Sequence, residues 1–166
     1  MTILLRKPKD GDFEARAQLG YHPTVLRGFG LIRETSSPMS FSEAKEWVSR
    51  IETHSHAWII EHQNELLGEI RLDNLNSHDR RASLAIAIVD YRKLGQGLGQ
   101  ESIHTCLNLA FNDLNLHRVS VRVLSSNVRA IRCYEACGFQ KEGVERGAAL
   151  TDWGWEDDIM MGILGS

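Results

Sequence analysis

Several features that would place the chain in a specialised class of protein are missing from the sequence. No apolar run approaches the roughly 18 residues that a membrane-spanning helix needs, and the opening segment MTILLRKPKDGD contains no apolar signal-peptide core. The net charge is −3, the pI is about 6.2, and lysine and arginine form no dense stripe, which disfavours a nucleic-acid-binding surface. We therefore expect a cytoplasmic globular protein with neither a membrane nor a nucleic acid among its partners.

Cysteine, proline and clustered histidine are scarce as well. The three cysteines are an odd number and all fall within helix-like patterns, so they indicate reduced thiols and not a disulfide framework. The short sequence His54-Ser55-His56 is too isolated to predict a metal site. The 166 residues contain no repeat, low-complexity stretch or linker, which predicts a single domain spanning residues 1–166.

The spacing of apolar residues predicts a mixed α/β chain. Ser40 and Glu43 form a capping-box pattern ahead of an apolar stripe at helical spacing, and Asn127 is a predicted N-cap. Helices are predicted at two short stretches within 10–32, and at 40–51, 98–114 and 127–137. Strands are predicted at 2–8, 82–89, 117–124, 143–149 and 155–164, with a hairpin in 56–72 that turns at Gln63 and Asn64 and a polar connection at 74–81.

Gly95, Gly97 and Gly99 alternate where a helix is predicted to begin, although glycine is a poor helix former. The start of a helix has unpaired N–H groups and a partial positive charge, both of which attract anions. Glycine lets the main chain approach a ligand closely and adopt a positive φ. Together with Arg92 and Lys93, these glycines indicate a phosphate-binding loop; a glycine-rich turn that binds nothing is the alternative.

Two common phosphate-binding motifs do not fit this loop. A P-loop needs G-x-x-x-x-G-K-[ST], which the chain lacks, and a dinucleotide fingerprint needs a third glycine where Gln100 stands. The spacing R-x-x-G-x-G does fit, from Arg92 to Gly97. In this form the segment resembles the acyl-CoA pyrophosphate loop of the GNAT superfamily of N-acetyltransferases, in which the loop joins the fourth strand to the third helix.

A second segment, NVRAIRCYEACGF from Asn127 to Phe139, is similar to that superfamily's N-x-x-A-x-x-x-Y-x-x-x-G-F pattern at every fixed position. From about Ala57 onward the chain most resembles the branch that includes ribosomal-protein alanine N-acetyltransferases. The resemblance implies a central, mostly antiparallel, twisted sheet with helices on both faces and acyl-CoA in the cleft between the fourth and fifth strands. It also implies that an amine, either a protein N-terminus or a small molecule, attacks acetyl-CoA directly in a ternary complex. Similar proteins are commonly dimers, which leaves a homodimer open.

The resemblance also assigns roles to individual residues. Backbone groups of Ile88 and Val89 would bind the pantetheine arm, Asn127 would lie beside that arm, and Ala130 would leave room for the cofactor. Arg92 would add charge to the loop. Main-chain amides would hold the pyrophosphate, contributed by Lys93, Leu94, Gly95, Gln96, Gly97, Leu98 and Gly99.

Acetyl transfer to an amine places three demands on a catalytic site. The amine must be neutral, the carbonyl oxygen needs a hydrogen-bond donor as charge builds on it, and the departing thiolate benefits from a proton. Tyr134 could supply that proton, although its helical spacing with Ile131 and Cys137 equally suits a core residue. A backbone N–H near Ile88 could serve the oxyanion. Glu69 is the first candidate for the base, and a solvated strand position is its alternative.

Some features leave the function open. Ser83 stands where related sequences often have an acidic residue, so a water chain or selection of the neutral amine could replace a carboxylate base there. A CoA-binding regulatory module without turnover is the alternative to an enzyme. Ser83, Ala85 and Ala87 could form a substrate groove or admit a closely packed helix. The segment TDWGWEDD could form an acidic, aromatic mouth for a cationic amine, or simply an exposed turn.

Overall fold

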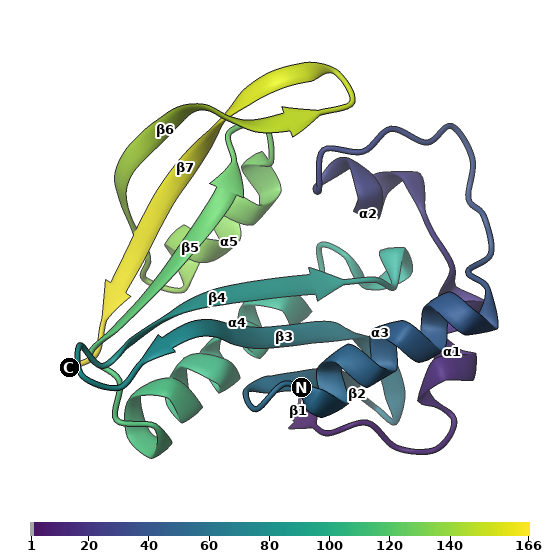
Figure 1. Ribbon diagram of the computed structural model, residues 1–166, viewed down its shortest axis with the longest axis horizontal. Coiled ribbons are helices and arrows are strands. Elements are labelled where there is room, and N and C mark those ends of the chain that lie inside the picture. The colour runs from purple at the N-terminus through teal and green to yellow at the C-terminus, as the bar shows by residue number, and fades with distance from the viewer. Residues whose placement is uncertain (1) are drawn as a thin grey trace.

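A seven-stranded sheet forms the centre of the protein, for which a computed structural model describes residues 2–166 (Figure 1). Its strand order is β1-β2-β3-β4-β5-β7-β6. All neighbours are antiparallel except β4 and β5, which run parallel. The predicted mostly antiparallel sheet is therefore confirmed. The strands are β1 (Ile3–Arg6), β2 (Ala57–His62), β3 (Glu65–Asn76), β4 (Arg81–Ile88), β5 (Arg118–Leu124), β6 (Gln140–Thr151) and β7 (Gly154–Leu164).

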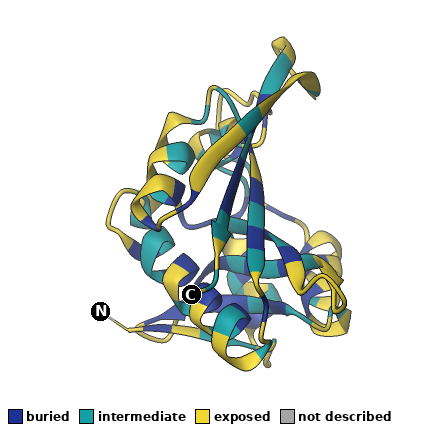
Figure 2. Cartoon of the chain, turned by 90° about the vertical axis from the view of Figure 1, so that its left-hand side faces the viewer, coloured by how far each residue is buried: buried dark blue, intermediate teal, exposed yellow. Residues whose placement is uncertain are grey.

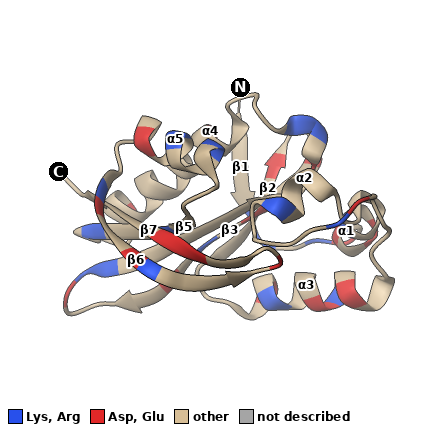
Figure 3. Ribbon diagram, turned by 90° about the horizontal axis from the view of Figure 1, so that it is seen from above, with Lys and Arg blue, Asp and Glu red and all other residues tan. Residues whose placement is uncertain are grey.

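Helices cover both faces of this sheet, as predicted. The helices α1 and α3 lie against one face and α4 and α5 against the other (Figures 1 and 3). A short helix, α2, precedes α3 near the far end of β4. In the order of the chain they are α1 (Asp12–Leu19), α2 (Pro23–Arg27), α3 (Phe41–Thr53), α4 (Leu98–Asn108) and α5 (Val128–Ala136). A π-helical turn, Leu109–Asp113, extends α4 to the end that the periodicity predicts.

The turns and helix caps predicted from short sequence motifs are present in the structure. The Ser40 hydroxyl accepts a hydrogen bond from the Glu43 N–H (3.1 Å), and the Glu43 carboxylate accepts one from the Ser40 N–H (2.9 Å), which completes the capping box. Gln63 and Asn64 have positive φ values of 52° and 65°, as a tight hairpin turn requires. The largest differences from the predicted boundaries are that β3 continues to Asn76, into the expected polar connection, and that β6 begins three residues early; the other ends differ by two residues at most.

Two main clusters of buried side chains hold the layers together, one on each face, and a third, of Ala17, Met39 and Ala44, joins α1 to α3. Leu67, Ile70, Leu98 and Ile103 belong to the larger cluster, between the sheet and α4 and α5. Trp47 belongs to the smaller one, which joins α3 to the opposite face. Buried segments follow the middle of the sheet, whereas the β6–β7 hairpin projects with mostly exposed residues (Figure 2). Among residues 2–166 no helix is both long and apolar enough to cross a membrane.

The backbones of β3 and β4 approach each other unusually closely at Gly68. A Cβ atom at this position would lie 1.8 Å from the Ala87 carbonyl oxygen, which only glycine avoids. Just beyond it, the Leu67 carbonyl accepts hydrogen bonds from the N–H groups of Val89 (2.8 Å) and Asp90 (3.2 Å). Gly68 therefore determines where the end of β4 lies.

We predict that Gly68→Ala lowers the free energy of unfolding by about 2–4 kcal/mol, because the new methyl group forces two backbones apart. Urea denaturation followed by circular dichroism measures the change. Gly143→Ala is the matched control, since a Cβ there meets no atom within 4 Å, and its effect should stay within about 0.5 kcal/mol. Equal stability of the two variants would contradict this account of the strand contact.

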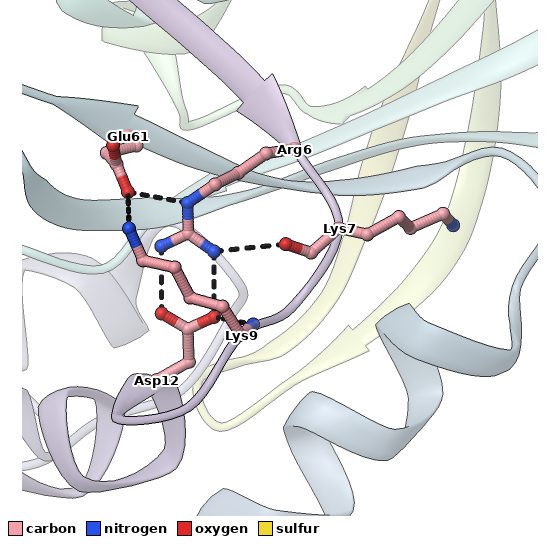
Figure 4. Close-up of polar contacts among 5 residues, drawn as sticks. All are labelled: Arg6, Lys7, Lys9, Asp12 and Glu61. Carbon is pink, nitrogen blue, oxygen red and sulfur yellow. Dashed lines mark hydrogen bonds and ion pairs between the residues drawn. The ribbon is translucent and has the colours of Figure 1, made fainter.

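A cluster of charged side chains ties β1, β2 and the start of α1 together (Figure 4). The Arg6 guanidinium donates two hydrogen bonds to the Asp12 carboxylate, both at 2.8 Å, and one to Glu61 Oε2 at 2.5 Å. Lys9 Nζ also contacts Glu61 Oε2, at 2.9 Å. Hydrogen bonds from Lys9 and Arg6 hold the pKa of Glu61 below its ordinary value, against the opposing effect of burial. Folding therefore favours the ionised form of the Glu61 carboxylate over the protonated form.

The lowered pKa of Glu61 makes its stabilising effect dependent on pH. Because the folded-state pKa lies below the unfolded value of about 4.3, the contribution is complete above that pH and is lost as the pH falls through the folded value. We expect Glu61→Gln to be less stable than wild type at pH 7, with a difference that shrinks towards pH 3.5 in urea titrations. The exposed Glu52→Gln is the control and should show no such convergence. A difference that grows on acidification would refute the assignment.

Candidate functional site

The strands β4 and β5 pair only near their first residues. Arg81, Ala82 and Ser83 pair with the first three residues of β5, and Ser83 Oγ lies 3.4 Å from Ser120 Oγ. Beyond this point the strands diverge (Figure 1), and a cavity of about 630 Å³ lies between them. We call it the β4–β5 cleft; it is bordered by residues 84–88 of β4, residues 122–124 of β5 and parts of α4 and α5.

The glycine-rich loop forms one end of the β4–β5 cleft. Gly95 and Gly97 have φ values of 76° and 79°, and a Cβ at either position would meet no atom within 4 Å. Gly97 is the N-cap of α4 and supplies no side-chain acceptor to the first turn of that helix. An uncapped helix start beside open glycine backbone is suited to binding an anion. The loop residues that line the cleft are Lys93, Leu94, Gly95, Gly97 and Gly99.

Both basic side chains of the loop already have carboxylate partners. Arg92 donates to both oxygens of the buried Asp90, at 2.9 Å each, and Lys93 Nζ lies 3.1 Å from Glu65 Oε2. Although burial opposes its ionisation, the hydrogen bonds from Arg92 hold the pKa of Asp90 below its ordinary value. Gln96 Nε2 also donates to the Arg92 carbonyl at 2.8 Å. These contacts hold the loop in shape, and the Arg92 guanidinium is engaged by Asp90.

Ile88 and Val89 lie on different sides of the end of β4. Ile88 lines the β4–β5 cleft, whereas Val89 lines a second cavity. The Val89 N–H donates to the Leu67 carbonyl at 2.8 Å. The N–H of Val89 is thus occupied by β3, and of the two residues only Ile88 lines the β4–β5 cleft.

The opposite wall of the cleft is α5, which contributes Asn127, Ala130 and Tyr134. Both ends of the Asn127 side chain are used within the protein. Its Oδ1 accepts from the Ala130 N–H (3.2 Å), and its Nδ2 donates to the Gly28 carbonyl (3.2 Å). Asn127 therefore caps α5, as predicted, and also ties it to the segment after α2, which sequence patterns did not indicate.

Tyr134 combines the two expectations for it, because it is both packed in the core and at the wall of the cleft. It is 7% exposed and packs edge-to-face against Phe139, with ring centroids 5.5 Å apart. Burial raises the pKa of its hydroxyl. The hydroxyl is therefore protonated at neutral pH, which leaves it able to act as a hydrogen-bond donor.

A second cavity, of about 620 Å³, lies among α1, α2, α3 and strands β2 to β4. We call it the helix-side pocket. Glu69 lines it, in register with Ala87 on β4, and Glu69 Oε1 lies 3.6 Å from Arg71 Nη1. The pocket and the cleft share residues 85–87 of β4 and, from the α2 region, Val25 and Phe29. Glu69 and Tyr134 thus border different cavities that meet along β4.

Several residues at these cavities carry no signal in the sequence. Phe29 belongs to a segment with little periodicity, and Arg122, whose Nε lies 3.1 Å from Asp158 Oδ2, reaches the cleft from β5. Conversely, Trp153 and Trp155 line neither cavity in the described part of the chain. Trp155 is 71% exposed at the β6–β7 turn. The exposed-turn interpretation therefore fits the two tryptophans, whereas Asp158 of the same segment is buried and lines the cleft.

Ser83 lies where β4 and β5 are still paired, outside the lining of both cavities. Ala85 and Ala87 border both, and Ala87 also packs against the buried cluster that includes Trp47 and Ile51 of α3. Within residues 2–166 no group of three or more histidine, cysteine, aspartate or glutamate side chains could hold a metal ion.

The cysteines provide a chemical test of the cleft. Cys133 lines it and is half-buried, and a hydrogen bond with Cys137 lowers its pKa. Cys106 is fully buried, which raises its pKa to about 12. We expect iodoacetamide to alkylate Cys133 at least about tenfold faster than Cys106, as followed by peptide mass spectrometry. Cys133→Ser should remove the fast phase, and rapid labelling of Cys106 would mean that the described packing is wrong.

Sequence comparison relates the chain to acetyltransferases. Residues 2–140 match the family model of the acetyltransferase (GNAT) domain. A probable N-acetyltransferase of Bacillus subtilis is 25% identical over 123 residues, which cover 74% of this chain and 68% of the relative. The spermidine N(1)-acetyltransferase of Vibrio cholerae is 32% identical over 108 residues, which cover 63% of this chain and 61% of the relative.

The whole fold also has a counterpart among solved structures. The crystal structure of spermidine N-acetyltransferase from Vibrio cholerae in complex with CoA and spermine superimposes with a TM-score of 0.78 at 26% identity. The superposition covers 98% of this chain and 95% of that chain. None of these relatives is named as a ribosomal-protein alanine N-acetyltransferase, so they support the superfamily and not that particular branch.

Proposed function

The chain belongs to the GNAT acetyltransferase family and is an acetyl-CoA-dependent N-acetyltransferase, and we propose that it acetylates the primary amine of a small molecule in a ternary complex. One observation carries the proposal. The β4–β5 cleft and the helix-side pocket approach the sheet from its two faces and share residues 85–87. A thioester in the cleft and an amine in the pocket would meet there.

In this arrangement the glycine-rich loop binds the pyrophosphate of acetyl-CoA. The amides of residues 93–99 supply the hydrogen bonds, in line with the open backbone at Gly95 and Gly97. The pantetheine arm lies along Ile88, whose side of β4 has no strand partner in the cleft. Ala130 presents only a methyl group from the facing wall, which leaves room for the arm. Asn127 acts indirectly, by holding α5 in place.

The chemistry is a direct transfer of the acetyl group. The amine nitrogen attacks the thioester carbonyl carbon, the C–S bond breaks, and the thiolate of CoA departs. Glu69 accepts the proton that the nitrogen loses. The ordinary pKa of a tyrosine, about 10, already exceeds the value of about 8.5 typical of a thiol, and burial raises the pKa of Tyr134 further, so complete proton transfer from it would be unfavourable. Tyr134 instead stabilises the developing thiolate by donating a hydrogen bond.

A small molecule is the preferred acceptor because the structural relative named above is a spermidine acetyltransferase that binds spermine. The likeness of the chain to ribosomal-protein alanine N-acetyltransferases would instead make a protein N-terminus the acceptor. An alanine-initiated peptide therefore belongs in the same substrate panel as the small amines. Acetylation of that peptide alone would reassign the acceptor without changing the reaction.

We predict that Tyr134→Phe lowers kcat by roughly 100-fold, because the variant loses only the hydroxyl that stabilises the thiolate. The KM for acetyl-CoA should change by no more than a few-fold. Release of CoA thiol, measured with an amine panel, reports both constants.

Tyr91→Phe is the matched control for that experiment, since Tyr91 lies outside both cavities and its ring stays stacked on His22. This control should retain the wild-type kcat. Binding of CoA without acetylation of any amine or peptide would overturn the proposed function. Unchanged turnover in Tyr134→Phe would remove only the role of that hydroxyl.

A further inference from the structure

The helix-side pocket has an excess of positive charge, which bears on the acceptor if the proposed function holds. Three arginines line it, Arg16, Arg50 and Arg71, against one carboxylate, Glu69. Arg71 is engaged by Asp73, at 2.9 Å, as well as by Glu69. The positive charge left over therefore comes from Arg16 and Arg50.

Arg16 is buried, and no carboxylate of the described residues 2–166 forms an ion pair with it, although Glu69 and Glu43 lie near enough to favour its charge. It is 6% exposed, and its guanidinium donates to the Gly20 carbonyl at 2.8 Å. Its Nε is buried and has no hydrogen-bond partner among the described residues. Burial lowers the pKa of Arg16, against the smaller opposing effects of Tyr21, Glu69 and Glu43. A guanidinium has five donors, and most of them have no use in the fold itself.

The neighbours of Arg16 hold its guanidinium in place but do not neutralise it. Its Cζ lies 5.5 Å from the centre of the Trp47 ring and 5.8 Å from that of Tyr21. Aromatic faces stabilise a cation modestly and accept no in-plane hydrogen bond from Nε. Because an unpaired buried charge is costly, an arginine kept in this state by a folded protein is suited to a ligand. Its planar fork matches a carboxylate or a phosphate.

The amine end of such a ligand has a different neighbour. Glu69 lies in register with Ala87, beside the place where pocket and cleft meet. The pocket thus offers a carboxylate near the proposed transfer point and a free guanidinium on α1. We propose that the acceptor is a small amine that also carries an anionic oxygen group, carboxylate or phosphate, which Arg16 binds with help from Arg50 at the mouth. A polyamine, which is cationic at both ends, would place a positive charge against Arg16.

Three probes of equal length test this charge preference: hexylamine, 6-aminohexanoate and 1,6-diaminohexane. Each has six carbons and a primary amine at one end, and the far end is a neutral methyl group, a carboxylate or an ammonium group. We expect kcat/KM for 6-aminohexanoate to exceed that for hexylamine by about tenfold or more, and 1,6-diaminohexane to be the poorest. Comparison of 3-aminopropanoate with 2-aminoethyl phosphate distinguishes the two anionic groups. A preference for 1,6-diaminohexane or spermidine overturns the inference while leaving the acetyltransferase function intact.

Arg16→Met tests the assigned residue, because it keeps the apolar stem and removes the charge. It should lower kcat/KM for 6-aminohexanoate by about 10- to 100-fold, the effect of a lost hydrogen bond to a charged group, and change that for hexylamine by no more than about threefold. Arg146→Met, on the exposed β6 strand, is the control and should leave both values unchanged. If Arg16→Met does not fold, Arg50→Met, at an exposed position, should weaken the same preference.

A binding experiment keeps the inference testable without turnover. Calorimetric titration of 6-aminohexanoate into the complex of the protein with CoA, which cannot donate an acetyl group, should detect binding in the wild type. In Arg16→Met the dissociation constant should be at least about tenfold higher. Equal affinity of the two proteins would overturn the inference. If this binding difference is observed but no amine in the panel is acetylated, the result counts against the proposed function and not against the inference.

Discussion

The incomplete pairing of β4 with β5 is the constraint on which the site depends. Each strand is fully paired along its other edge, β4 with β3 as far as Ile88 and β5 with β7 as far as Leu124. Both can therefore diverge without losing their place in the sheet. The edges that face the cleft keep main-chain groups free of a strand partner, and such edges are ready to bond an extended ligand. A fully closed sheet would have neither the cleft nor these groups.

Buried charge holds the parts that surround this opening. Asp90 anchors the loop at the end of β4 through Arg92, while Arg6 joins β1, the start of α1 and Glu61. In both places a carboxylate and a guanidinium satisfy each other, so neither retains an unpaired charge. The guanidinium of Arg16 is different because no carboxylate within residues 2–166 forms an ion pair with it, and Glu69 and Glu43 act on it only at longer range. That contrast separates charges that support the fold from one that is available to a substrate.

The sequence predicted the fold best where one segment contains all the partners of an interaction. The capping box at Ser40, the turn at Gln63 and the cap at Asn127 formed as expected because each depends on residues a few positions apart. Predictions were weaker where backbones from distant segments meet. The hydrogen bond from the Val89 N–H to β3 had no signal in the sequence, and no local pattern could indicate the close contact that Gly68 permits.

The sequence by itself determined the superfamily, the element types and the glycine-rich loop, since these are encoded by spacing along the chain and by the conformational freedom of glycine. Only the tertiary structure decided what surrounds the acceptor. The helix-side pocket is assembled from α1, α2, α3 and β3, which the sheet brings together from separate parts of the chain. Arg16 Nε is buried and has no hydrogen-bond partner among the described residues. Which groups surround a side chain is decided by three-dimensional packing, so the sequence alone could not indicate this.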